Sequence, residues 1–145
     1  MMAGVHGRDV TTLFPLQTRL LVATMGHHNA ATREPQAAMK SPLKAQGFVR
    51  TPPFIAALLA RWALRAPTDQ VLDAGFGEGV FLLESAKRLL ALGTSVPRLP
   101  MQLHGVDSHP DAVQGLRRTF QSYGLPTDLP GVLAGDFFET AFPPV

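Results

Sequence analysis

The chain has 145 residues, 46% of them hydrophobic, with a formal charge of +2 and an isoelectric point near 9.5. This length suits one small domain, and the sequence holds no apolar run of about 20 residues that would span a membrane. The absence of cysteine excludes disulfides and thiolate metal sites. The weakly basic charge permits nucleic-acid binding but does not indicate it.

Residues 1–40 differ from the rest in being rich in Ala, Thr, Gly and His without a sustained hydrophobic period. A proline and an arginine interrupt the apolar patch at 13–23, so it lacks the clean apolar stretch of a signal peptide. We expect 1–40 to be a flexible leader, or an extension upstream of the true start. Residues 41–145 would then form the domain of a cytoplasmic protein.

The hydrophobic pattern predicts alternating helices and strands after the leader. In chain order we expect a helix at 53–64, a strand at 70–74, a helix at 80–92, a strand at 102–106, a helix at 110–123 and a strand at 132–135. Right-handed crossovers would place the three parallel strands side by side in an α/β, Rossmann-like sheet. The ligand cleft of such a sheet lies at the carboxyl ends of its strands.

The first expected helix follows Thr51, whose hydroxyl can cap a helix with prolines in its first turn. Apolar residues at helical spacing would form the face that packs on the sheet, namely Ile55, Leu58, Leu59, Trp62 and Ala63. As a pattern alone, this segment is an ordinary amphipathic helix.

The most informative segment runs from the strand at 70–74 into the next helix. Asp73 lies at the end of the strand, and Gly75, Gly77 and Gly79 follow at intervals of two residues. Glycines let a backbone turn sharply and approach a ligand closely, and the helix after them begins with unpaired N–H groups. The spacing differs from the dinucleotide pattern Gly-x-Gly-x-x-Gly. The acid favours a cofactor with a cationic group, such as the amino group of S-adenosylmethionine. A glycine-rich turn without a chemical role is the alternative.

The second expected strand also ends in a carboxylate, that of Asp107. A carboxylate at this position can accept hydrogen bonds from both hydroxyls of a ribose. The alternative is that Asp107 caps the helix that Pro110 opens in its first turn, and one residue can do both.

An acid and two aromatic residues, Asp136, Phe137 and Phe138, follow the third expected strand. The carboxylate can accept a hydrogen bond from the exocyclic amine of an adenine, while a ring packs on the face of the base. The alternative is core packing by Phe137 or Phe138, and we expect at least one of them in the core.

Four segments together resemble adenine-specific DNA methyltransferases of the restriction–modification type, which belong to the class I S-adenosylmethionine-dependent superfamily. They are Phe-Val-Arg-Thr-Pro-Pro before the first helix, Asp-Ala-Gly-Phe-Gly-Glu-Gly-Val-Phe-Leu-Leu, Gly-Val-Asp and Gly-Asp-Phe-Phe. The resemblance covers about residues 41–145. The glycine loop specifies only the superfamily, and the Thr-Pro-Pro segment at this distance narrows it to the DNA enzymes.

The resemblance implies a class I methyltransferase sheet, of which the chain holds the first three strands, with S-adenosylmethionine as cofactor. Residue by residue, it implies that Thr51 contacts the methionine carboxylate, that Asp73, Ala74, Gly75, Gly77 and Gly79 form the loop under methionine and ribose, that Asp107 binds the ribose hydroxyls with Ser108 beside the adenine, and that Asp136 and Phe137 bind the adenine.

One family motif has no counterpart in the chain. The catalytic tetrapeptide, Asp/Asn/Ser-Pro-Pro-aromatic, accepts hydrogens from the target amine and stacks on the extruded base. The segment 141–145, Ala-Phe-Pro-Pro-Val, has no polar residue before its prolines and no aromatic after them. We therefore expect a truncated N-terminal part of a DNA methyltransferase, without catalytic residues or metal ligands of its own and with a sheet edge left open for a fourth strand.

DNA would be the substrate of the complete enzyme, and a C-terminal half or a target-recognition domain would be the partner of this part. Two alternatives stay open. One is a methyltransferase of the same fold that acts on protein glutamine or ribosomal RNA. The other is a remnant that binds the cofactor without catalysing transfer.

Overall fold

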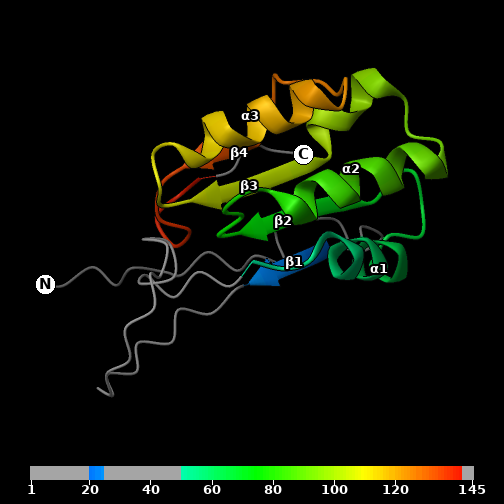
Figure 1. Ribbon diagram of the computed structural model, residues 1–145, viewed down its shortest axis with the longest axis horizontal. Coiled ribbons are helices and arrows are strands. Elements are labelled where there is room, and N and C mark those ends of the chain that lie inside the picture. The colour runs from blue at the N-terminus through cyan, green and yellow to red at the C-terminus, as the bar shows by residue number, and fades with distance from the viewer. Residues whose placement is uncertain (1–19, 25–49, 142–145) are drawn as a thin grey trace, which may run out of the picture.

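The computed structural model describes residues 20–24 and 50–141, which form an open parallel sheet flanked by helices (Figure 1). The strands lie in the order of the sequence, β1 at Leu20–Thr24, β2 at Gln70–Ala74, β3 at Leu103–Asp107 and β4 at Val132–Ala134. The helices are α1 at Pro53–Ala63, α2 at Val80–Leu92, the 3₁₀ helix η3 at Val96–Met101 and α3 at Ala112–Ser122. This α/β arrangement is compatible with a Rossmann-like fold.

Two of the six expected elements, β2 and α2, begin and end at the predicted residues. The third expected helix starts later than predicted, because Pro110 lies in a turn and Asp111 is the residue before the first helical position. The N–H of Ala112 donates to the carbonyl of His109 and closes this turn at 3.1 Å. Part of the expected linker at 93–100 is the helix η3, whose two prolines have the φ values that a short 3₁₀ helix needs.

The sheet contains one strand more than the sequence led us to expect. Strand β1 pairs in parallel with β2, with Leu20 opposite Gln70 and Thr24 opposite Ala74. We expected a sheet edge left open for a fourth strand, but β2 has a neighbour on each side, β1 and β3. The strand has the sequence Leu-Leu-Val-Ala-Thr, which is apolar up to its threonine. The other residues of the predicted leader, and residues 142–145 of the proline segment, lie outside the described residues.

Helix α1 packs through a different face from the predicted one. Ala56, Ala60 and Leu64 are fully buried, whereas Leu58 and Trp62 are exposed. The prediction was wrong because α1 is apolar nearly all round, so its sequence fits more than one inward face. The two alanines let α1 lie close to α2, which runs beside it (Figure 1).

The predicted cap of α1 by Thr51 is also wrong. Pro52 occupies the N-cap position, and no side chain caps the helix. The carbonyl of Pro52 accepts the N–H groups of Ile55 and Ala56 at 3.0 and 3.2 Å. A proline in the first helical position removes one of the N–H groups that a cap would otherwise have to satisfy.

The hydrophobic core joins residues of the helices to residues of the strands. Its largest fully buried side chains include Leu82, Leu89, Leu99, Leu103, Leu116 and Phe120. Gly79 is the N-cap of α2, and a Cβ atom at this position would overlap the side chain of Leu116 from α3. Glycine therefore leaves the space that the buried Leu116 side chain fills.

Candidate functional site

The loop between β2 and α2 has three glycines in the left-handed region of backbone space. The φ angles of Gly75, Gly77 and Gly79 are 87°, 53° and 75°. A residue with a side chain adopts such angles only at a cost of about 1–2 kcal/mol. The N–H of Gly75 donates to the carbonyl of Val106 at 2.7 Å, which ties the loop to β3. The glycine spacing is thus a requirement of the turn itself.

Asp73 lies in β2 just before this loop and is 97% buried, with 3% of its surface exposed. One of its carboxylate oxygens, Oδ2, makes no hydrogen bond. Burial, followed by repulsion from the carboxylate of Asp107, raises the pKa of Asp73 from 3.8 to about 7. A buried carboxylate without full hydrogen bonding is costly to ionise, so the site favours a cation at this point.

Asp107 joins the end of β3 to the glycine loop. Its Oδ2 accepts the N–H of Gly77 at 2.7 Å, across 30 residues of sequence. Its Oδ1 accepts the backbone N–H of His109 at 2.8 Å and lies 3.0 Å from Nδ1 of the same residue. The N-cap of α3 is Asp111, so the alternative in which Asp107 caps this helix is wrong. Asp107 instead forms a turn with His109 and holds the loop.

These contacts limit how a ribose could bind to Asp107. A carboxylate offers about four acceptor sites, and Gly77 and His109 occupy three of them when Nδ1 carries a proton. Two ribose hydroxyls need two sites. Because the side chain of His109 is 46% exposed, its ring is the contact that can move most easily. His109 is a residue of the site that the motif analysis did not single out.

The end of β4 lies beside the end of β3, where the N–H of Gly135 donates to the carbonyl of Asp107 at 2.9 Å. The carboxylate of Asp136 is exposed and accepts the N–H of Phe138 at 2.8 Å. The rings of Phe137 and Phe138 meet edge to face with centroids 5.5 Å apart. Phe138 is 94% exposed and Phe137 is partly buried, and neither belongs to the core cluster. The expectation that one of them fills the core is therefore wrong.

The segment before α1 also reaches the glycine loop. Arg50, next to Thr51 in the chain, pairs with Glu78 at an Nη2–Oε1 distance of 2.5 Å. Both side chains are exposed, so the pair adds little to stability. It nevertheless joins the residue before the Thr-Pro-Pro segment to Glu78 of the loop, and the role of Thr51 stays a prediction.

The structure thus brings most of the predicted site residues to one edge of the sheet, where the strands end (Figure 1). Hydrogen bonds connect the glycine loop with Asp107 directly, and Ala74 is opposite Val106 in the sheet register. Ser108 is exposed immediately after Asp107. The roles of these residues in binding a cofactor stay predictions. Phe76, a buried residue within the loop, was missed because its position in the motif carries no chemical signal.

Within residues 20–24 and 50–141, no cluster of histidine and acidic side chains could hold a metal ion. None of the helices in these ranges combines the length and the hydropathy that a membrane crossing needs. Comparisons with family models, with curated proteins and with solved structures give no match.

Proposed function

We propose that this chain binds S-adenosylmethionine at the carboxyl ends of β2, β3 and β4, as the N-terminal part of a methyltransferase. The observation that carries the proposal is the buried Asp73, which has an oxygen without a hydrogen bond beside a loop of left-handed glycines. The α-ammonium group of the cofactor would supply the missing donor and neutralise the carboxylate. The pyrophosphate of a dinucleotide would place further negative charge there.

The other strand ends fit the rest of this cofactor. Asp107 would accept the ribose hydroxyls once the ring of His109 moves aside, since Gly77 already occupies part of its carboxylate. Asp136 is exposed at the next strand end and offers a free acceptor for an adenine amine, with Phe137 adjacent to it. The cofactor supplies an electrophilic methyl group on its sulfonium. The residues of this chain bind and orient it.

The Thr-Pro-Pro segment near the loop favours DNA adenine as the methyl acceptor of the complete enzyme. The sequence contains no Asn-Pro-Pro-Tyr-type segment, so we assign cofactor binding to this chain and base binding to residues outside it. Without an acceptor held opposite the methyl group, the advantage of positioning is lost. Protein glutamine and ribosomal RNA are the alternative acceptors for the same site.

Calorimetry of the 145-residue chain with S-adenosylmethionine, S-adenosylhomocysteine and NAD tests the proposal. We expect saturable binding of the first two and none of NAD. Asp73→Asn should weaken binding of S-adenosylmethionine about tenfold or more, the scale of one charge-assisted hydrogen bond. Asp128→Asn removes an exposed carboxylate in the loop before β4 and serves as the control. Equal affinity for NAD, or an unchanged affinity of Asp73→Asn, would contradict this assignment.

A further inference from the structure

Helix α1 exposes three large apolar side chains in one row. Phe54, Leu58 and Trp62 are 70%, 62% and 71% exposed, and residues four apart lie above one another on a helix. Single exposed apolar residues are ordinary, but a contiguous row of large ones is typical of an interaction surface. Two of the small residues of α1, Ala56 and Ala60, are buried, whereas this row of large residues is exposed.

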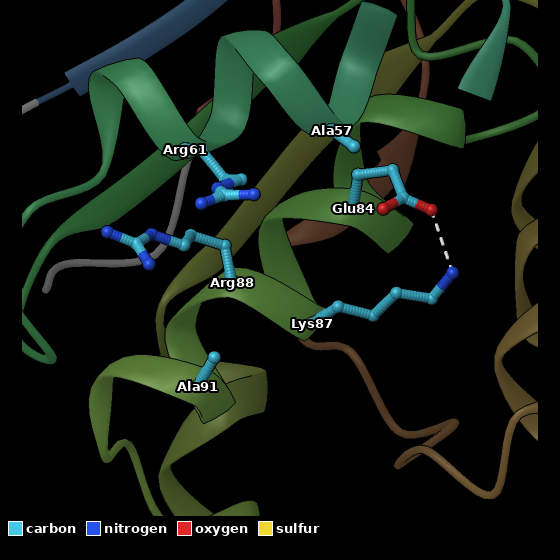
Figure 2. A pocket seen from close by; sticks show the side chains of 6 residues that line it. All are labelled: Ala57, Arg61, Glu84, Lys87, Arg88 and Ala91. Carbon is cyan, nitrogen blue, oxygen red and sulfur yellow. Dashed lines mark hydrogen bonds and ion pairs between the residues drawn. The ribbon is translucent and has the colours of Figure 1, made fainter. Parts of the chain in front are cut away.

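A hollow of about 360 Å³ lies next to this row, between α1 and α2. Figure 2 shows the side chains of Arg61 from α1 and Arg88 from α2 reaching into the gap between the two helices. Ala57 and Ala91 also line the hollow, and their small side chains leave room for an incoming group. The hollow is open to solvent.

The charges in the hollow are unbalanced. Glu84, its one acidic residue, is paired with Lys87 at 2.7 Å. Among the described residues, no carboxylate pairs with Arg61 or Arg88. Arg88 donates from Nε to the carbonyl of Leu64 at 3.2 Å, which fixes its guanidinium without neutralising it. The hollow therefore offers two guanidinium groups to an anion.

The row and the hollow are one continuous surface. At about 100° of rotation per residue, Ala57 and Arg61 occupy the strip of α1 directly beside Phe54. We call this the α1 surface, made of the row Phe54, Leu58 and Trp62 and of the hollow with Arg61 and Arg88. An occupant must then match an apolar strip and, beside it, a recess that accepts a carboxylate.

We propose that the α1 surface binds an amphipathic helix of a partner protein whose apolar face carries an adjacent acidic side chain. The apolar strip would cover the row, as in helix-in-groove recognition, and the carboxylate would enter the hollow, where guanidinium groups bind it with two hydrogen bonds each. This inference does not depend on the cofactor proposed above.

Other occupants fit the α1 surface less well. Duplex nucleic acid is bound through its phosphates and does not cover large apolar side chains. A lipid surface is too flat to enter the recess between two helices. Two copies of α1 would bring like charges together, because the helix contains Arg61, is followed by Arg65 and has no acidic residue.

Trp62 is the one tryptophan of the chain and reports directly on this surface. The probe is a synthetic helical peptide with a leucine row flanked by glutamates, compared with the same peptide carrying lysine in place of glutamate. We expect the glutamate peptide to shift Trp62 emission to shorter wavelength in a saturable manner, and the lysine peptide to have no effect. Arg61→Glu should weaken binding about tenfold or more, and Arg61→Gln by a smaller factor.

Arg117→Glu is the matched control, because it makes the same charge change at an exposed position of α3. It should bind the glutamate peptide like the unmodified chain, and circular dichroism should show all variants equally folded. Equal binding of both peptides, or full binding by Arg61→Glu, overturns the proposal. So does a Trp62 shift produced by anionic vesicles or duplex DNA but not by the peptide. If the Trp62 emission of the chain without peptide shifts to shorter wavelength as the protein concentration rises, the surface binds a second copy of the chain. If Trp62 emits at short wavelength at every concentration, the chain's own residues cover the surface. Both outcomes overturn the proposal.

Discussion

Replacing Asp73 with asparagine should make the ligand-free chain more stable at high pH. Asparagine has nearly the same shape as aspartate and carries no charge. In the folded chain the pKa of Asp73 is raised from 3.8 to about 7 by burial and by Asp107. Between these values the folded state holds a proton that the unfolded state has released, so stability falls as pH rises through this window and levels off above it.

The magnitude follows from the width of the window. The interval from 3.8 to about 7, at about 1.4 kcal/mol per pH unit, corresponds to an upper limit of about 4 kcal/mol. Entry of water and small shifts of the backbone reduce this cost. We therefore expect the free energy of unfolding of Asp73→Asn to exceed that of the unmodified chain by about 2–4 kcal/mol at pH 8. Near pH 4, where the folded Asp73 is already neutral, the two proteins should be equally stable.

Urea denaturation at pH 4, 5, 6, 7 and 8 measures this difference, with circular dichroism as the probe of unfolding. Asp128→Asn, at an exposed carboxylate, should follow the unmodified chain at every pH. If the difference in free energy of unfolding between Asp73→Asn and the unmodified chain stays constant with pH within about 0.5 kcal/mol, then Asp73 ionises at its ordinary pKa. The reasoning that places a cation at this carboxylate would then fail.

Three further outcomes are expected. The affinity for S-adenosylmethionine should rise as the pH increases toward about 7, because Asp73 must lose its proton to pair with the ammonium group. Calorimetry in two buffers of different ionisation enthalpy should detect the released proton. Gly79→Ala should destabilise the chain by about 2–4 kcal/mol in urea denaturation, because the alanine would have a left-handed φ and would overlap Leu116 of α3. Gly93 also has a positive φ, 105°, but has open space around it, so Gly93→Ala should cost only about 1–2 kcal/mol. Asp107→Ala should lose about 1.5–3 kcal/mol of cofactor binding, while His109→Ala should bind more tightly because it frees an acceptor; a loss of affinity in His109→Ala would refute the acceptor count.

Glycines at element boundaries made some elements predictable from the sequence. The bounds of α2 were predicted correctly because glycines with left-handed angles stand on both sides of it, Gly79 before and Gly93 after. Strand β2 ends at Ala74, immediately before the first glycine of the loop. In both cases the residues that decide the boundary lie next to it in the chain.

Features that depend on distant residues were not predictable in this way. Strand β1 pairs with β2 across 50 residues of sequence, from Leu20 to Gln70, and a five-residue apolar run by itself does not reveal its partner. The inward face of α1 depends on how close α2 comes, which favours alanines over the larger residues. The hydrogen bond from Gly77 to Asp107 likewise exists only because β2 and β3 are neighbours.

The two carboxylates at the strand ends give the candidate site its character. The carboxylate of Asp107 accepts the hydrogen bonds that hold the loop, and its repulsion adds to the burial that raises the pKa of Asp73. The ligand-free site is therefore destabilised at neutral and higher pH by an energy that pairing Asp73 with a cation would release. If S-adenosylmethionine is that ligand, it should raise the unfolding midpoint of the chain more at pH 8 than at pH 6. This increase between the two pH values should be larger for the unmodified chain than for Asp73→Asn. A ligand that stabilised both proteins equally at both pH values would have to bind without contact to Asp73.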